Sequence, residues 1–410
     1  MRLLVVTQYF WPEPFRINDL VEDLVARGHQ VTVLTGQPNY PEGRIHPAFK
    51  AAPGDFAEYA GAEVVRVPIL PRGKGSLRLA LNYLSFVLSG LFVGTWRLRG
   101  RACDAIFVFQ TSPITAALPA LWFRRLKRAP LLMWVLDLWP ESLAAVGVVT
   151  SPRLLAQVGR LVSFIYRRCD RILAQSEAFF PNIARYSGEA SRVRYFPGWA
   201  EPIFQGSLEQ VPVAPELAPF QDTFNVMFAG NLGEAQDFPA ILDAAVALKD
   251  RADIRWLIVG DGRAAEALRT GIRDRGLEER VFLLGRHPLE RMPAFMRGAH
   301  ALLVSLRKDP AFSLTIPGKV QAYMAAGLPV LGMLDGEGAR VITEAGAGLT
   351  CPAGDGAALA GRVQELAGLP EAERRAMGLR GRAFCAQAFD RTTLISALEG
   401  WMEEVRTRGL

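Results

Sequence analysis

Short runs of almost continuous apolar residues recur along the chain and alternate with stretches of helical spacing. Residues 17–27 show the helical pattern, with apolar side chains three and four positions apart as far as Gly28. Strands without polar alternation, separated by helices, indicate a parallel sheet that helices cover on both faces. The runs that we interpret as strands of a first such domain are 3–9, 30–36, 64–69, 105–110, 131–137 and 171–176.

The same scheme begins again in the second half. The Pro-rich acidic stretch 211–222 separates the two halves and is interpreted as a linker. We therefore expect two doubly wound, Rossmann-like α/β domains, 1–199 and 200–390, with a final helix in 391–410 that packs back on the first. Two such domains are expected to hold a ligand in a cleft between them. The second set of runs is 225–231, 255–262, 281–286, 300–306, 328–334 and 348–352.

Length and composition agree with this organisation. The chain has 410 residues, of which 50% are hydrophobic and 21% charged, and this suits two globular domains. Its four cysteines and four histidines are dispersed without metal-ligand spacing, so we expect no metal site. The apolar run at the N-terminus is too short for a signal peptide. Free cysteines and the absence of that signal predict a cytoplasmic protein.

Charge is divided unequally between the halves. Residues 1–200 carry 24 Lys+Arg and 14 Asp+Glu, whereas 201–410 carry 23 and 27. Within the basic half, residues 79–96 are nearly all apolar and lie between two basic groups, and a second apolar and basic block follows at 116–128. The basic residues that flank 79–96 are Arg72, Lys74, Arg78, Arg97, Arg99 and Arg101.

Three interpretations of residues 79–96 stay open. The segment is a helix buried against the sheet, a helix that lies on a bilayer with its arginines at the headgroups, or a membrane span. Asn82 and two serines interrupt the run, and strands are expected on both sides, which argues against a span. An anionic membrane surface is a better partner for the basic half than nucleic acid.

Glycine-rich turns between strands and helices provide the candidate chemistry of the second half. Backbone amides in such turns, together with a helix dipole, suit a phosphate group. One turn lies at 228–233, a second segment at 309–330 leads into a helix at Lys319, and a third turn lies at 335–342. The residues that we select as ligands of a diphosphate-containing donor are Gly230, Asn231, Gly233, Lys308, Ser313, Lys319, Gly336, Glu337 and Gly338.

Several motifs resemble one known family. YMAAGLPV (323–330), RVI (340–342) and GAGL (346–349) are similar to the nucleotide-sugar domain of retaining glycosyltransferases of the GT-B fold. The blocks at 7–43 and 135–142 resemble the family's bacterial surface-polysaccharide members, above all the N-acetyl-L-fucosamine transferases of O-antigen assembly. The resemblance implies a UDP-sugar donor, a polyprenyl-diphosphate-linked acceptor and no metal. Together with the basic and apolar stretches of the first half, it leads us to expect a protein attached to the inner face of the bacterial inner membrane.

The chain departs from that family at its donor site. The family's two glutamates, eight positions apart, correspond to Leu314 and Ala322, and its Arg and Lys in the first glycine-rich turn correspond to Asn231 and Gln236. The resemblance then implies that other residues bind the donor. Gln321 is the candidate for the ribose and Glu337 for the sugar, while the lysines at 308 and 319 are the candidates for the diphosphate.

Five residues of the first half are candidates for catalysis and acceptor binding. Glu13 and Arg16 follow the first strand, in the loop where the resemblance implies acceptor binding. Asp137, Trp139 and Glu141 follow a central strand, where loops of doubly wound sheets carry function. We select Asp137, Glu141 and Glu13 as catalytic, and Arg16 and Trp139 as acceptor-binding.

Two other functions are compatible with the sequence. A nucleotide-sugar 2-epimerase uses the same fold but needs no membrane acceptor. A non-catalytic nucleotide-sugar-binding partner would explain the missing glutamates. Incubation of a UDP-sugar with and without acceptor distinguishes the three functions by their products.

Overall fold

The computed structural model describes residues 1–73, 75–145, 147 and 149–407. Lys74, one of the basic residues before the apolar segment, therefore lies outside the described residues. Contacts divide the chain into two compact units. Unit 1 comprises Met1–Pro197 together with the chain from Thr392, and unit 2 comprises Gly198–Arg391.

Unit 1 is built on an eight-stranded sheet in the order β3-β4-β2-β1-β5-β6-β7-β8. All pairs are parallel except β3 with β4. Each predicted run forms a strand, and the bounds of β2 and β5 coincide with the prediction. The strands are β1 (Arg2–Val6), β2 (Gln30–Gly36), β3 (Glu58–Tyr59), β4 (Ala62–Val67), β5 (Ala105–Gln110), β6 (Leu131–Val135), β7 (Arg171–Ala174) and β8 (Val193–Tyr195).

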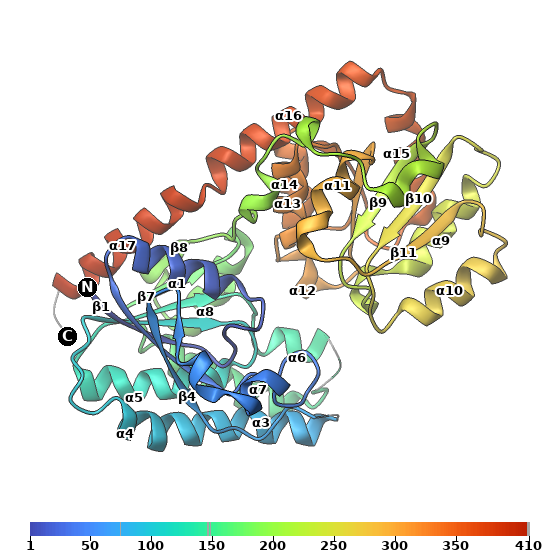
Figure 1. Cartoon of the computed structure of the whole chain (residues 1–410). Coiled ribbons are helices and arrows are strands. Elements are labelled where there is room, and N and C mark those ends of the chain that lie inside the picture. The colour runs from blue at the N-terminus through green and yellow to red at the C-terminus, as the bar shows by residue number, and fades with distance from the viewer. Residues whose placement is uncertain (74, 146, 148, 408–410) are drawn as a thin grey trace. The chain divides into compact units, whose positions relative to one another are not determined.

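Helices cover both faces of this sheet. Parallel crossovers are right-handed, and strand order runs one way from β1 to β2 and the other way from β4 through β8, so α1 lies on one face and α3, α5 and α7 on the other. Figure 1 shows α3, α4 and α5 together below the strands, and α1 and α17 above them. The helices are α1 (Arg16–Ala26), α2 (Pro47–Ala51), α3 (Ser76–Ser89), α4 (Thr95–Arg97), α5 (Ala117–Lys127), α6 (Glu141–Ala145), α7 (Pro152–Tyr166), α8 (Phe180–Ser187) and α17 (Arg391–Thr407).

Unit 2 has a six-stranded, fully parallel sheet in the order β11-β10-β9-β12-β13-β14. Neighbouring residues of a strand enter different cores: Met227 packs on one face, and Val226 and Phe228 on the other. The strands are β9 (Phe224–Ala229), β10 (Ile254–Val259), β11 (Val281–Gly285), β12 (Ala301–Ser305), β13 (Val330–Met333) and β14 (Gly348–Cys351). The helices are α9 (Phe238–Ala247), α10 (Ala265–Asp274), α11 (Met292–Arg297), α12 (Pro310–Ser313), α13 (Gly318–Ala326), α14 (Glu337–Glu344), α15 (Gly356–Gly368) and α16 (Glu371–Ala388). The predicted fold, two doubly wound Rossmann-like α/β units, is confirmed.

The Pro-rich stretch 211–222 is not a linker. It belongs to unit 2, where Pro215–Phe220 form 3-10 turns and bury Leu217 and Phe220 in the core beside Met292 and Phe295. The chain passes between the units earlier, at Pro197 and Gly198. Proline and acidic residues indicated an exposed connection, but the apolar residues between them anchor the segment.

The C-terminal helix α17 packs on unit 1 from Thr392 onward. Glu399 binds Arg27 and His29 at 2.7 Å each, and Arg171 donates to Glu404 at 2.6 Å. Trp401 packs edge-on against Phe196, with ring centroids 6.1 Å apart. These contacts make the last helix part of the domain that begins the chain.

The apolar segment forms one continuous helical rod from α3 through a π-helical turn (Gly90–Gly94) to α4. By length and composition, Leu77–Arg97 is the one helix among the described residues that could cross a membrane, and 28% of its most apolar window is buried. Its inner face packs on the domain: Asn82 is fully buried, accepts from Gln8 at 2.7 Å and donates to the Leu70 carbonyl at 2.6 Å. One side of the rod therefore belongs to the core of unit 1, and most of its length is partly or fully exposed.

The hydroxyl of Tyr323 joins α13 to the end of β9. It donates to the carbonyl of Ala229 and accepts from the same residue's amide, both at 2.9 Å, in the core. We predict that Tyr323→Phe, which leaves both backbone groups buried without a partner, lowers the free energy of unfolding by about 1–3 kcal/mol. Urea denaturation measures the loss. Tyr40→Phe removes an exposed hydroxyl and should have no effect; equal losses in both variants would contradict the prediction.

Candidate functional site

The carboxyl edge of the unit 2 sheet gathers most of the selected residues. Strand order reverses between β9 and β12, because β10 and β11 lie on one side of this pair and β13 and β14 on the other. Loops diverge at such a reversal and leave room for a ligand at the carboxyl ends of the strands. The turn after β9 and the segment from β12 to α13 both begin at this point.

The turn after β9 is held close to the turn after β10. Gly230 and Gly260 adopt φ angles of +140° and +148°, and a Cβ on Gly260 would lie 1.9 Å from the carbonyl oxygen of Gly230. The Asn231 side chain is packed beside Gly233 and Gly262, 2.9 Å from the Cβ position of each. Side chains are thus excluded, so a ligand here meets the backbone.

Lys319 places its ammonium group in this turn. Its Nζ donates to Oε1 of Gln236 at 2.9 Å, and it lies 3.5 Å from the ring centroid of Phe228. A Cβ on Gly230 would come within 3.2 Å of the same nitrogen. Burial lowers the pKa of Lys319 to about 7. Since Lys319 forms no ion pair with any described carboxylate, a bound anion would provide the missing counter-charge.

A second pair of selected residues meets at the neighbouring strand. A Cβ on Gly336 would lie 1.9 Å from the carbonyl oxygen of Ser313, so the turn after β13 rests directly on the end of α12. Glu337 begins α14, and its carboxylate binds the guanidinium of Arg340 through two contacts of 3.0 Å. A Cβ on Gly338 would lie 3.0 Å from the ring of Pro317, at the start of α13. The third glycine-rich turn is therefore close-packed against the segment that leads to Lys319.

The structure does not bring two other selected residues into these groups. Lys308 is exposed and forms no ion pair with the described residues. Gln321 is 3% exposed, and its amide donates to the carbonyl of Gly198 at 2.8 Å, where the chain enters unit 2. Its side chain thus already has a structural contact. The ribose role assigned to Gln321 from the family pattern receives no support from this geometry.

In unit 1, Glu13 organises two loops at the carboxyl edge of the sheet. Its Oε1 accepts from the amides of Asn39 and Tyr40 at 2.7 and 2.6 Å, and its Oε2 from the amide of Phe10 at 3.1 Å. Burial raises the pKa of Glu13 to about 7 against the opposing effect of these donors. A carboxylate whose two oxygens are occupied by backbone amides fixes loop shape, so the geometry favours a structural role over the catalytic one we selected.

Asp137 and Glu141 are near in sequence but face different partners. Asp137, which follows β6, accepts from the Ser142 hydroxyl and from Trp139 Nε1, the latter at 3.2 Å, and burial raises its pKa. Glu141 begins α6 and turns to α8, where it binds Asn182 at 2.7 Å and Arg185 at 2.8 Å. Asp137 therefore joins Glu13 as a carboxylate whose pKa is raised by burial at this edge.

Arg16 and Trp139 remain to be placed. Arg16 begins α1 and contacts Asp19 at 3.5 Å. Trp139 is 7% exposed, and its indole is used to hold Asp137. Neither contact contradicts a role in acceptor binding, but Trp139 offers little of its ring to a ligand.

Residues that we did not select form a polar group at the same edge. The Gln8 Oε1, Tyr9 hydroxyl and Gln110 Oε1 atoms are buried without a hydrogen-bond partner among the described residues. Gln8 and Gln110 follow or end the adjacent strands β1 and β5, where strand order reverses in this sheet. Unpaired buried acceptors are costly and mark candidate ligand contacts. The signal was present in the sequence, as a glutamine at the end of each apolar run.

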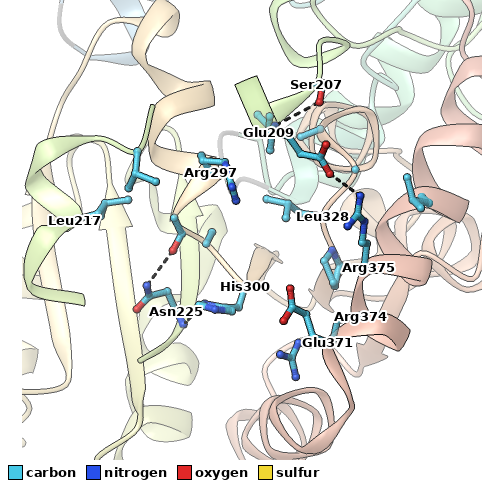
Figure 2. Close-up of a pocket in the computed structure, with 18 of the residues that line it drawn as sticks. Ser207, Glu209, Leu217, Asn225, Arg297, His300, Leu328, Glu371, Arg374 and Arg375 are labelled. Carbon is cyan, nitrogen blue, oxygen red and sulfur yellow. Dashed lines mark hydrogen bonds and ion pairs between the residues drawn. The ribbon is translucent and has the colours of Figure 1, made fainter. Parts of the chain in front are cut away.

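A cavity of about 500 Å³ in unit 2 lies away from these residues. Figure 2 shows it beside Asn225 and His300, at the amino ends of β9 and β12. Arg375 there is paired with Glu209 at 2.5 Å. Since ligands of doubly wound sheets bind at the carboxyl ends, this cavity is not the candidate site. Among the described residues no group of three His, Cys, Asp or Glu could hold a metal ion.

Comparison with known proteins identifies the activity. Residues 15–199 match the model of the glycosyl transferase 4-like domain, and residues 223–368 match that of the glycosyl transferases group 1. The chain is a glycosyltransferase. It is 28% identical to the probable glycosyltransferase WbjE of Pseudomonas aeruginosa over 314 residues, which cover 72% of this chain and 74% of WbjE.

Two further comparisons extend over more of the glycosyltransferase. It is 25% identical over 342 residues to WcaI of Escherichia coli K12, a putative colanic acid biosynthesis glycosyl transferase, with coverage of 80% and 82%. Its fold matches the crystal structure of HepE from Anabaena in complex with UDP, with a TM-score of 0.71, 17% identity, and coverage of 98% and 100%. The GT-B fold of the glycosyltransferase is confirmed. The group 1 match contains the whole carboxyl-edge site of unit 2.

We predict that Glu13→Gln destabilises unit 1 of the glycosyltransferase by about 1–3 kcal/mol, because an amide nitrogen would replace one acceptor of a backbone N–H. Thermal and urea denaturation measure the loss. Glu22→Gln, at an exposed position of α1, is the matched control and should match the wild type. A stable Glu13→Gln protein with strongly reduced activity would instead restore the catalytic role.

Proposed function

We propose that the protein is a retaining glycosyltransferase that moves a sugar from a UDP-sugar to a polyprenyl-diphosphate-linked saccharide. N-acetyl-L-fucosamine, or a related amino or deoxy sugar, is the proposed donor sugar. The use of UDP is supported by the fold shared with HepE, whose structure contains UDP. A role in surface polysaccharide synthesis is supported by the likeness to WcaI, which is named for colanic acid biosynthesis.

One observation carries the donor side: a half-buried lysine ammonium, without a carboxylate partner among the described residues, in a glycine turn at the reversal of strand order. The diphosphate would lie against the backbone at Gly230, with Lys319 as its counter-charge. In the reaction the bond from the anomeric carbon to the diphosphate oxygen breaks, and negative charge grows on the leaving group. A fixed cation and backbone donors stabilise that charge more in the transition state than in the ground state.

The charge at Lys319 also explains how the site can lack the family's usual basic residues. Gln236, at the position where the family has a lysine, is the residue whose Oε1 lies 2.9 Å from Lys319 Nζ. In this proposal a lysine of the helix replaces the lysine of the turn, and its ammonium group lies beside the residue at that position. The comparison with the family pattern showed that the usual basic residues are absent from the turn. The contact between Lys319 and Gln236 supports Lys319 as their replacement.

The acceptor would bind at the carboxyl edge of unit 1. Its hydroxyl forms the new bond to the anomeric carbon on the face that the diphosphate leaves, and its proton passes to the departing phosphate. Asp137 is the proposed group that orients the acceptor, and the unpaired oxygens of Gln8 and Gln110 are further contacts. The proposed location of the reaction is the cytoplasmic face of the inner membrane.

We predict that Lys319→Gln weakens UDP binding by about 10- to 100-fold at pH 6.5, because it removes a charge-assisted contact. In the wild type, a rise in pH from 7 to 9 neutralises Lys319 in the free protein, so UDP affinity should fall across this interval. The variant should lack this dependence. Isothermal titration calorimetry measures both effects. Lys249→Gln, an exposed lysine of unit 2, is the control and should behave as wild type.

We also predict that transfer proceeds without a divalent metal, since Lys319 and backbone amides supply the positive charge. Transfer of radiolabelled sugar to the lipid-linked acceptor should be unchanged by a chelator. Activity that disappears on chelation and returns with Mg²⁺ would refute the metal-free mechanism. A changed sugar in the absence of acceptor would identify an epimerase, and no product in either assay would identify a binding partner.

A further inference from the structure

Unit 1 has one face that carries almost no negative charge. Between residues 64 and 169 there are fifteen Lys+Arg but only three Asp+Glu, which are Asp104, Asp137 and Glu141. This interval contains α3, α4, α5 and α7, and right-handed crossovers place α3, α5 and α7 on the same face of the sheet. No acidic residue occurs in any of these four helices.

Apolar side chains form a stripe along the outside of the α3–α4 rod. Leu77 and Phe92 are each 73% exposed, and Trp96 is 62% exposed. The positions recur at intervals of three or four residues, so they lie on one side of the rod. The full stripe is Leu77, Leu81, Leu84, Leu88, Phe92 and Trp96.

The helix α5 continues this surface beside the rod. Gly90 lets the two approach closely, because a Cβ there would lie 2.8 Å from the ring of Pro119. The Trp122 indole nitrogen donates to the Thr95 hydroxyl at 2.9 Å, and the Trp122 side chain remains 44% exposed. The two tryptophans therefore stand on adjacent helices with their rings partly in solvent, as is typical of side chains at a membrane interface.

The helix α7 packs on α5 and adds a third basic and apolar strip. Leu154 is 51% and Phe164 45% exposed, and the guanidinium of Arg168 lies 3.8 Å from the Phe164 ring centroid. The basic residues of this strip are Arg153, Arg160, Arg167 and Arg168, all of them exposed. The sequence had pointed to 79–96 with its flanks and to the block at 116–128, and the strip on α7 extends that surface.

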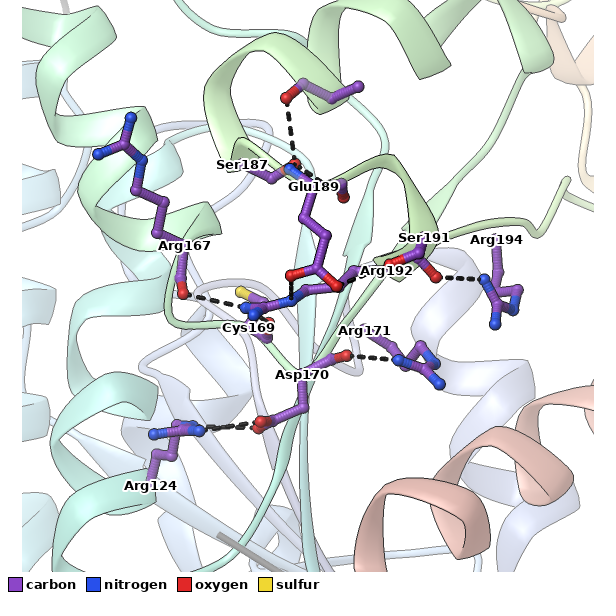
Figure 3. Close-up of polar contacts among 11 residues, drawn as sticks. Arg124, Arg167, Cys169, Asp170, Arg171, Ser187, Glu189, Ser191, Arg192 and Arg194 are labelled. Atoms are coloured by element: carbon purple, nitrogen blue, oxygen red, sulfur yellow. Dashed lines mark hydrogen bonds and ion pairs between the residues drawn. The ribbon is translucent and has the colours of Figure 1, made fainter. Parts of the chain in front are cut away.

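The nearest acidic side chains are already neutralised. Figure 3 shows Asp170, just after α7, bound by Arg124 at 2.9 Å, and Glu189 bound by Arg192, while the guanidinium of Arg167 points away from these pairs. Among the described residues, the exposed arginines of the face form no ion pair at positions 78, 97, 99, 125, 128, 153, 160, 167 and 168. The charge of the face is therefore unbalanced within unit 1.

We propose that the outer surface of α3–α4, α5 and α7 binds an anionic phospholipid bilayer, with the rod lying along the surface rather than crossing it. A bilayer matches both properties of the face, since leucines and aromatic rings enter the acyl boundary while arginines reach headgroup phosphates. A span would require the rod to leave the sheet, yet its inner side is fixed there by the buried Asn82. This surface does not depend on which sugar the enzyme transfers.

The test uses the full chain and vesicles of phosphatidylethanolamine with phosphatidylglycerol, compared with phosphatidylcholine alone. At 0.1 M NaCl the wild type should sediment with the anionic vesicles, and high salt should weaken binding. Arg153→Gln combined with Arg160→Gln and Arg167→Gln should reduce binding by about 100-fold, since each arginine near an anionic surface contributes about fivefold. Leu84→Ser combined with Phe92→Ser should also reduce binding.

The matched control carries Arg297→Gln and Leu379→Ser, an exposed arginine and an exposed leucine of unit 2, and should bind as wild type. Equal losses in the control, full binding by the α7 variant, or equal binding to both vesicle types would overturn the proposal. So would a dimer in size-exclusion chromatography that the apolar variant dissolves, which would identify a second copy as the occupant.

A second measurement does not depend on multiple substitutions. Brominated lipids quench tryptophans that enter the acyl region, so they should quench the wild type more than Trp96→Phe. Equal quenching would show that the rod does not enter the bilayer. UDP binding without vesicles should be unchanged in every surface variant, and this separates failure of the membrane surface from failure of the donor site.

Discussion

Both sheets of this protein are covered by helices on both faces, and this constraint decides where chemistry is possible. Most side chains of a strand in such a sheet are buried, so polar groups concentrate at the strand ends and on the outer faces of helices. In unit 2 the strand order reverses between β9 and β12, and the glycine turn lies at the carboxyl end of β9, beside this reversal. The proposed location of the donor site follows from the strand order, before any catalytic residue is considered.

The positions of the strands were predictable because burial on both faces leaves a simple record, a run of apolar residues without alternation. The partners of the polar residues were not. Glu13 was selected as a catalytic carboxylate, yet two of its partners are backbone amides that any residues except proline at 39 and 40 would supply. Conversely, the sequence shows that Gln8 and Gln110 lie at the ends of apolar runs. Only the fold shows that the two strands are neighbours, so that the two glutamines lie at the same edge.

The stretches 79–96 and 211–222 were ambiguous for a related reason. Hydropathy shows that a segment must leave water, but it does not identify what covers it. Leu217 and Phe220 are buried in the core of unit 2. The stretch that composition had indicated as a linker is therefore packed against that core. The α3–α4 rod is covered on one side only. Phe86 lies on the buried side, and the leucines and aromatic residues of the other side stay exposed. Its apolar residues exceed what the domain can bury.

The two proposed surfaces of the enzyme use positive charge in opposite ways. Lys319 is a single ammonium whose low pKa reflects the burial that also makes it effective against one diphosphate. The arginines of the α3–α4, α5 and α7 face are exposed and spread over four helices and their ends, as weak contacts with many mobile headgroups require. The excess of positive charge in unit 1 therefore has a proposed role apart from catalysis, which is to bind the bilayer. The proposed lipid-linked acceptor would be confined to the bilayer, so a domain that rests on the bilayer would search for it in two dimensions instead of three.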